Sequence, residues 1–296
     1  MFTMFTQFFG NYLLEKRLIS PEALTEAFEI QKNTRMKLGV LAINAGYMTA
    51  EQVEKAHDQQ QRADKRIGDV MVEMGFLTQE QVEELLKTQP AGHLLLGQAL
   101  VDKGHMTNAQ FEEALKSYKE ENQISDSDFD DVNDDAAQKL VEKFCNFNSS
   151  SNSEYMTKYV SILFKNLIRF IGGDFTPMEI HEINAPLNNV ISQKLSGGLD
   201  AVTIIDTDTD ISMVRFASRF SGEHLLVNDE YTKACVSEFL NLHNGLFTVN
   251  ISNDANIEIQ LEPQSYDETF DAADIEKACV IPIFFSFGMV NFIIHM

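Results

Sequence analysis

The residues best placed to do chemistry are Glu238 and Asn241, in the stretch KACVSEFLNLHNG at 233–245. A helix is expected over about 229–243, because apolar residues recur there at helical spacing and define a face that turns to the core. That face comprises Cys235, Val236, Phe239, Leu240 and Leu242. Glu238 and Asn241 are three residues apart on the other side and are therefore neighbours. A carboxylate accepts hydrogen bonds and an amide both donates and accepts them. Alone, such a pair is typical of a solvated helix face, so its surroundings decide its role.

Other constellations argue against a metal centre or a familiar catalytic site. Asp206, Asp208 and Asp210 imitate the start of a calcium loop, but Ile211 and Ala217 stand where that loop needs Gly and Glu. We therefore expect a charged hairpin turn there. The seven histidines lack metal-ligand spacing, and the three cysteines include no CxxC. No nucleophile elbow, phosphate loop or catalytic cysteine arrangement is present in the sequence.

The elements expected around the pair form an α+β domain over 154–296. A long amphipathic helix should end at the glycines 172–173, and the strands should pair antiparallel. The expected strand pairs are AVTIID with ISMVRFA (201–206 and 211–217), FTVNIS with NIEIQL (247–252 and 256–261), and VIPIFFSF with FIIHM (280–287 and 292–296). The last segment is long enough to cross a membrane. Pro282, Gly288 and its β-branched and aromatic residues instead indicate two buried strands around a turn.

The residues after the pair extend it into a longer motif. Gly245 follows Asn241 by four residues, and Pro263 follows it by 22. This arrangement resembles the signature of CheC/CheX-type chemotaxis phosphatases, with a single copy as in CheX. The resemblance covers about 154–296. Ala234 stands where that family has Asp or Ser, which leaves a non-catalytic relative open.

The resemblance implies an enzyme that removes the phosphoryl group from the aspartate of a CheY-like response regulator. Asn241 would hold the attacking water in line, and Glu238 would pair with a lysine of the receiver. Phosphoryl transfer depends mostly on positioning and charge stabilisation. The receiver supplies its own Mg²⁺, so no intrinsic cofactor is expected. CheX relatives also imply a homodimer through this domain.

The first part of the chain repeats itself with a period of 29, with units starting at 8, 37, 66 and 95. Each unit has an apolar residue and Gly near its start. In three of the units a second Gly ends a short helix, and a capping Thr-x-x-Gln then opens a second helix. One unit cannot bury its apolar face alone, so the four must stack. We expect an all-α tandem repeat of helical hairpins over 1–118.

This repeat pattern resembles the N-terminal cyclic-di-GMP-binding domains of MshE-type ATPases. Units two and three fit it best, and the ligand residues it implies are Lys37, Leu38, Gly39, Gln60, Arg66, Ile67, Gly68, Asp69 and Gln89. In this interpretation the glycines let a ligand approach the backbone closely. Arg66 would stack on a guanine or meet a phosphate. The alternative is a purely structural scaffold, but packing alone would not require Gln or Arg at the unit ends.

Composition sets the remaining limits. The net charge of −22 argues against nucleic acid as a partner, because binding it relies on basic residues. The residues 119–153 are acidic and then rich in Ser and Asn, as expected of a linker. The opening MFTMFTQFFG lacks the pattern of a signal peptide, and we expect a cytoplasmic protein. The sequence thus predicts a two-domain signalling protein, either a phosphatase regulated by cyclic-di-GMP or a non-catalytic adaptor for a receiver or a pilus or motility component.

Overall fold

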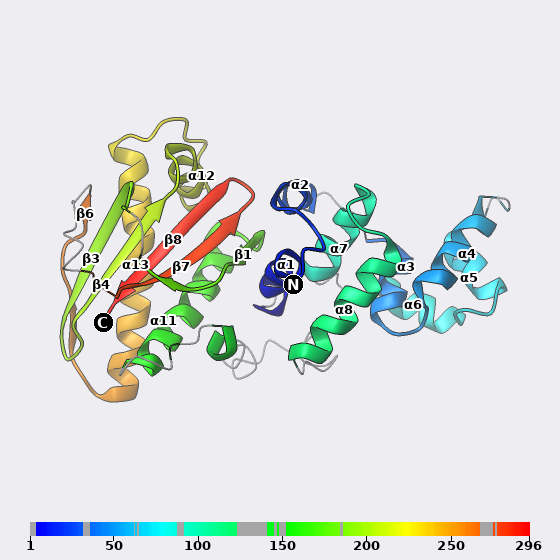
Figure 1. Cartoon of the computed structure of the whole chain (residues 1–296), viewed down its shortest axis with the longest axis horizontal. Helices are drawn as coiled ribbons and strands as arrows, with labels where there is room; N and C mark the ends of the chain where they lie inside the picture. The colour runs from blue at the N-terminus through cyan, green and yellow to red at the C-terminus, as the bar shows by residue number, and fades with distance from the viewer. Residues whose placement is uncertain are drawn as a thin grey trace. The chain divides into compact units, whose positions relative to one another are not determined.

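The computed structural model describes residues 4–31, 36–61, 63, 65–87, 92–122, 141–144, 147, 152–183, 186–266, 275 and 277–296. The chain divides into two compact units, Met1–Val132 and Asn133–Met296 (Figure 1). The linker expected at 119–153 lies largely outside the described residues.

In the first unit, each 29-residue sequence unit contributes two helices. They are α1 (Met4–Glu15) and α2 (Pro21–Gln31), α3 (Leu38–Asn44) and α4 (Ala50–Gln60), α5 (Ile67–Glu73) and α6 (Gln79–Lys87), and α7 (Gly92–Asp102) and α8 (Asn108–Asn122). The first helices of units two to four are followed by Gly46, Gly75 and Gly104, with φ of 69°, 72° and 75°. Glycine adopts this left-handed conformation without steric cost, so it ends the helix there.

The second helices begin at the predicted caps. The hydroxyl of Thr49 accepts a hydrogen bond from Gln52 N, and the side chain of Gln52 accepts one from Thr49 N, which makes a capping box. Thr78 and Thr107 repeat both bonds with the glutamine three residues later. These bonds satisfy backbone N–H groups that have no partner within the helix.

The sequence units do not pack in chain order. Unit two packs against unit three through α4 with α5 and α3 with α6, whereas unit one packs against unit four through α2 with α7 and α1 with α8. Helices α3 and α4 of unit two also contact α7 and α8 of unit four. The spatial order of the units is therefore one, four, two, three.

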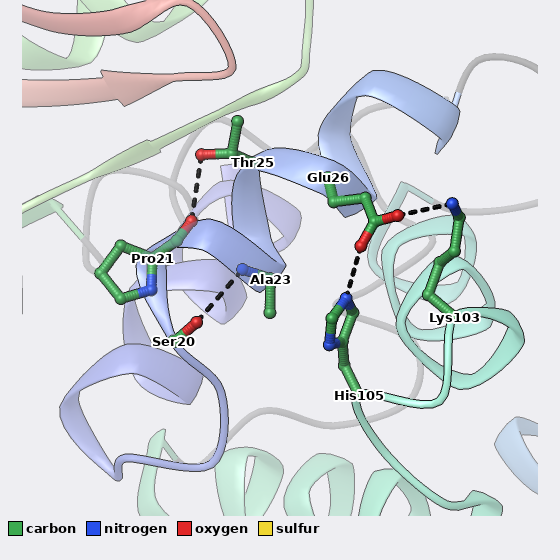
Figure 2. Close-up of polar contacts among 7 residues, drawn as sticks. All are labelled: Ser20, Pro21, Ala23, Thr25, Glu26, Lys103 and His105. Atoms are coloured by element: carbon green, nitrogen blue, oxygen red, sulfur yellow. Dashed lines mark hydrogen bonds and ion pairs between the residues drawn. The ribbon is translucent and has the colours of Figure 1, made fainter.

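A polar contact joins units one and four at the surface. Figure 2 shows Glu26 of α2 between Lys103 and His105, which follow α7; its carboxylate lies 2.7 Å from His105 Nε2. Hydrogen bonds from Lys103 and His105 hold the pKa of Glu26 below its usual value. All three side chains are partly open to solvent, so this contact contributes little stability and mainly helps to select which units pair.

The second unit places helices against an antiparallel sheet. Its helices are α11 (Ser153–Asn166), the π-helical turn η1 (Leu167–Ile171), α12 (Asp210–Ser221) and α13 (Glu230–Ala255). Its strands are β1 (Phe175–Pro177), β2 (His181–Glu182), β3 (Asn189–Gly197), β4 (Ala201–Thr207), β5 (Ile259–Leu261), β6 (Ser265–Tyr266), β7 (Cys279–Phe285) and β8 (Gly288–His295). The sheet order is β1-β7-β8-β4-β3-β5, with β2 beside β7 and β6 beside β3. All these pairings are antiparallel.

Of the three predicted strand pairs, the closing pair β7–β8 is confirmed and the other two are wrong. The stretch 211–217 lies in α12, where the Thr209 hydroxyl caps the helix by accepting from Ser212 N, and β4 pairs with β3 and β8 instead. The stretch 247–252 continues α13, because Phe247 and Ile251, four residues apart, are both buried on its core face. Tertiary burial at helical spacing outweighs the β-propensity of these residues.

Both faces of the sheet are covered. On one face, rings of α12, α13 and β8 cluster: Phe216 and Phe239 are 5.0 Å apart between ring centroids, and both contact Phe292. Figure 1 shows α13 running along this sheet, where it contacts β3, β4 and β5. The opposite face carries an apolar cluster of Val190, Ile204, Ile275, Ala278, Val280 and Ile293. Among the described residues, no helix combines the length and apolar character needed to cross a bilayer.

Candidate functional site

Glu238 and Asn241 lie on α13, a helix firmly started by its cap. Asp229 Oδ1 accepts a hydrogen bond from Thr232 N at 2.9 Å, and this bond lowers the pKa of Asp229. The core face of α13 includes Val236, Phe239 and Leu240, whereas the expected members Cys235 and Leu242 are only half-buried. Glu238 is exposed and Asn241 is half-buried. The pair therefore stands at the solvent side of a rigid helix, with Asn241 nearer the sheet.

The side chain of Asn241 is held by the sheet below it. Gln193 of β3 donates a hydrogen bond from Nε2 to Asn241 Oδ1 at 3.0 Å. The same Nε2 donates to the backbone oxygen of Glu262 at 2.9 Å. No described residue accepts a hydrogen bond from Asn241 Nδ2. One end of the Asn241 amide is thus anchored and the other end is available.

The other residues of the sequence motif meet at the same place. Glu262 N donates to Lys194 O at 2.9 Å, so β3 holds both backbone groups of the residue before Pro263. Pro263 itself is exposed. A Cβ added to Gly245 would lie 4.0 Å from Leu261 Cδ1, which places this turn of α13 against the end of β5. The spacing from Asn241 to Pro263 therefore corresponds to one return of the chain, from α13 through β5 to the side of β3.

A neutral core lies directly beneath the pair. His243 is fully buried, and its Nδ1 lies 3.1 Å from Asn166 Nδ2, which donates to it. Burial lowers the pKa of His243 to about 3, so the ring is uncharged near neutral pH. Its ring centroid is 4.4 Å from that of Tyr159. The buried side of α13 near the pair thus adds no charge to the site.

Ala234, four residues before Glu238, is exposed. Its methyl group provides neither a hydroxyl nor a carboxylate at that turn of the helix. The carboxylate and the amide are therefore the functional groups of this surface. Within the described parts of the chain, no three His, Cys, Asp or Glu side chains are grouped to hold a metal ion. An amide and a carboxylate without a nucleophile can position a water and a cation, but they need a reactive group brought by a partner.

The structure shows what surrounds the implied dinucleotide residues. A Cβ on Gly68 would lie 3.4 Å from Leu38 Cδ2, so the starts of α3 and α5 are adjacent. Leu38 is buried, Ile67 is half-buried, and Arg66 and Asp69 are exposed. Leu38 of unit two thus lies against Gly68 of unit three, and the other three residues are neighbours of Gly68 along the chain.

The repeated spacing of these glycines has a packing explanation, however. A Cβ on Gly39 would lie 2.6 Å from Val53 Cγ1, and one on Gly68 would lie 3.2 Å from Val82 Cγ1. In each hairpin the glycine lets the second helix approach the first. The space beside Gly39 and Gly68 is filled by protein on that side, so close approach of a ligand is not needed to explain these glycines.

The closing glutamines also have structural partners. Gln31 Nε2 donates to Gly92 O at 3.0 Å, and Gln60 Nε2 donates to Lys65 O at 3.1 Å. Gln31 thereby joins unit one to the start of α7, whereas Gln60 ties the end of α4 to the spacer that follows it. An amide at a unit end can thus tie a helix end to a backbone oxygen, which gives these glutamines a structural role without a ligand.

The remaining two ligand candidates differ in their setting. Lys37 Nζ forms an exposed ion pair with Asp102 Oδ1 at 2.5 Å. Gln89 lies outside the described residues. Lys37 is thus engaged with unit four, whereas Arg66 stays exposed.

Sequence reasoning missed Gln193 and Asn244, which complete the surroundings of Asn241. Both are buried. Gln193 occupies an inward position of β3, between Ile191 and Leu195, where an apolar residue is the usual choice. A polar residue in that alternation was the available signal. Its partner on α13 could not be read from the sequence.

No protein-family model and no curated protein matches this chain. Solved structures similar to it include the chemotaxis protein CheX from Vibrio vulnificus, with 13% identity, a TM-score of 0.41, and coverage of 48% of this chain and 97% of that one. The CheX–CheY–BeF3–Mg²⁺ complex from Borrelia burgdorferi has 16% identity, a TM-score of 0.41, and coverage of 47% and 96%. A CheC-like superfamily protein from Shewanella sp. PV-4 has 13% identity, a TM-score of 0.38, and coverage of 47% and 95%. The neighbours over about half of this chain are thus CheX- and CheC-like chemotaxis proteins.

Proposed function

We propose that the second unit hydrolyses the aspartyl phosphate of a CheY-like response regulator. The observation that carries this proposal is the exposed Glu238 beside Asn241, whose side chain is anchored by Gln193 and keeps an available N–H group. Anchored groups on a rigid helix suit a reaction in which the protein mainly positions the reactants.

In the proposed reaction, a water molecule attacks the phosphorus of the acyl phosphate. The bond between phosphorus and the aspartyl oxygen breaks, and the products are the free carboxylate and inorganic phosphate, which keeps the proton lost by the water. Asn241 holds the water in line with the breaking bond. A neutral amide suits this role because it adds no negative charge beside the phosphoryl group. Glu238 pairs with a lysine of the receiver and sets the angle of approach.

The test measures decay of a phosphorylated CheY-like receiver in the presence of the full-length protein. Asn241→Ala should lower kcat at least about tenfold, because the attacking water loses its alignment. Glu238→Gln should mainly raise KM, since it removes the charge that pairs with the receiver. The matched control is Asn253→Ala, an exposed asparagine further along the same helix, which should behave as wild type. Equal decay rates for wild type and Asn241→Ala would refute catalysis.

The competing proposal is a non-catalytic adaptor. It is favoured by Ala234, which stands where the resembled family has Asp or Ser. An adaptor would bind the receiver without speeding its dephosphorylation. Binding of the same variants to surface-immobilised receiver, measured with and without phosphorylation of the receiver, distinguishes an adaptor from a phosphatase. Light scattering of the purified chain would test the proposed homodimer.

We also propose that cyclic-di-GMP binds the first unit and changes this activity. The supporting observation is the adjacency of Leu38 and Gly68, which places the exposed Arg66 and Asp69 beside the start of α3. The phosphatase assay repeated with cyclic-di-GMP, together with calorimetry on wild type and Arg66→Ala, tests this idea. No heat of binding would leave the first unit as a scaffold.

A further inference from the structure

Four polar side chains, the half-buried Asn241 among them, form a connected network between the sheet and α13. Asn244 Nδ2 donates to Gln193 Oε1 and to Thr203 Oγ1, each at 2.8 Å. Thr203 Oγ1 donates to the backbone oxygen of Gln193 at 3.1 Å. Gln193 Nε2 then donates to Asn241 Oδ1 and to Glu262 O. Gln193, Thr203 and Asn244 are all buried, so these bonds are shielded from water.

The direction of the bonds that Gln193 Nε2 makes follows from a backbone carbonyl, which can only accept. The Thr203 hydroxyl donates its hydrogen to the backbone oxygen of Gln193, and in this arrangement it accepts from Asn244. Asn244 therefore points its NH2 group at Thr203 and at Gln193 Oε1. A backbone carbonyl only accepts, so Glu262 O independently requires the NH2 group of Gln193 on its side.

The constraint from Glu262 O reaches Asn241 through Gln193. Because Gln193 presents an N–H to Asn241, Asn241 must present its oxygen in return, and its own Nδ2 faces away from the sheet. The two ends of an amide are nearly alike in size, so shape alone would not select this orientation. The buried network selects it, and the outer end of Asn241 becomes a donor.

We propose that Gln193 is a positioning residue that sets which end of the Asn241 amide meets the water and phosphoryl group. This inference rests on the proposed function of Asn241 and adds its direction: Nδ2 donates to the oxygen of the attacking water, which keeps a lone pair directed at phosphorus. Gln193 itself touches no reactant.

The decisive variants change Gln193 while keeping its size. Gln193→Glu, studied at pH 8, replaces the NH2 group by an oxygen that cannot donate, so Asn241 loses its anchor and is expected to turn. Gln193→Met removes both donor and acceptor and serves as the second variant should a buried carboxylate impair folding. The matched control is Gln260→Glu, the same substitution at an exposed position of β5.

Two readouts separate positioning from general damage. In the phosphatase assay, both Gln193 variants should lower kcat about tenfold with little change in KM, because Glu238 is untouched. In the Asn241→Ala background the same substitutions should cause no further loss, since residues that act through one group are not additive. A loss of kcat that persists in that background would overturn the proposal.

The second readout needs no partner and no activity. The side-chain amide signals of Asn241 in a ¹H–¹⁵N spectrum, identified by their absence in Asn241→Ala, should shift in both Gln193 variants and stay unchanged in Gln260→Glu. Unchanged Asn241 signals would refute the positioning role. If the signals shift in the Gln193 variants but the wild type does not dephosphorylate any receiver, the proposed function alone is refuted.

Discussion

Asn241 and His243 are two residues apart on α13 and show how one helix serves two environments. Asn241 is half-buried, with one end of its amide held by Gln193. His243 is fully buried and accepts a hydrogen bond from Asn166. The same helix therefore presents polar groups toward solvent and also carries a titratable group into the core. Each residue has a consequence that can be measured.

The buried histidine predicts loss of stability in mild acid. The pKa of His243 is about 3 in the folded protein because burial disfavours the charged ring, and about 6.5 in the unfolded chain. Between these two pH values the unfolded chain binds a proton that the folded protein does not. The contribution of the neutral His243 ring to the free energy of unfolding is therefore complete above pH 6.5 and is lost as the pH falls toward 3. Protonation of this histidine in the unfolded chain should make the free energy of unfolding about 2 kcal/mol lower at pH 5 than at pH 7.5.

Urea denaturation at pH 7.5 and pH 5 checks this value. His243→Gln removes the titrating ring and should reduce the loss between the two pH values by about 2 kcal/mol. The control is His224→Gln, since His224 is exposed. A His243→Gln protein with the same pH dependence as wild type would show that the ring is already protonated or that water reaches it. His93 in the first unit, also buried with a pKa of about 3, should add a similar dependence there.

At the scale of elements, the helical hairpin depends on a glycine facing the second helix. In unit four, a Cβ on Gly97 would lie 2.1 Å from the ring of Phe111, which is fully buried. In unit three, a Cβ on Gly68 would lie 3.2 Å from Val82 Cγ1, a contact that a small shift relieves. The same position in the repeat is therefore far more constrained in one hairpin than in the other.

Alanine at these two positions should have different effects. Gly97→Ala forces α7 and α8 apart and should lower the free energy of unfolding by about 2 kcal/mol, within the range seen for overpacked cores. Gly68→Ala gains helix propensity and should stay within about 1 kcal/mol of wild type. Chemical denaturation of both variants compares them directly. A Gly97→Ala protein as stable as Gly68→Ala would mean that Phe111 moves aside without cost.

Elements also show where local sequence is a poor guide. The residues 247–252 include Val249 and Ile251, which favour strands, yet they continue α13 to Ala255. Isolated propensity predicted a strand pair there because the burial of Phe247 and Ile251 on one face of a helix depends on the sheet beneath it. By contrast, β7 and β8 were predicted because an apolar run with a glycine turn is sufficient to indicate them.

At the scale of the whole molecule, the excess of acidic residues is the dominant electrostatic feature. The chain has 45 acidic and 23 basic residues, a net charge of −22. Its described ion pairs are mostly exposed, such as Lys65 with Glu73 and Lys55 with Glu51, and pairs of this kind contribute little. Self-repulsion should therefore outweigh them and destabilise the compact state.

Salt should consequently stabilise this protein. Raising NaCl from about 0.03 M to 0.3 M shortens the Debye length from roughly 18 Å to about 6 Å and screens the repulsion between surface carboxylates. We expect Tm to rise by a few degrees, measured by thermal denaturation at pH 7.5. An equal osmolality of sucrose serves as the uncharged comparison. A fall in Tm with NaCl would show that the ion pairs, such as Lys37 with Asp102, matter more than the net charge.

The sequence by itself determined what depends on residues close along the chain. Caps such as Thr49, left-handed glycines such as Gly46 and the neighbouring positions of Glu238 and Asn241 follow from hydrogen bonds and helical geometry within about four residues. The two-helix pattern of each repeat unit and the final strand pair follow for the same reason.

Only the tertiary structure decided the features that depend on distant residues. The pairing of unit one with unit four, the contact of Gln31 with Gly92, and the anchoring of Asn241 by Gln193, 48 positions away, all join segments that the chain brings together by folding. Such contacts are selected by burial and by matching of donors with acceptors over the whole unit. No local pattern records that matching, which is why Gln193 became visible only beside α13.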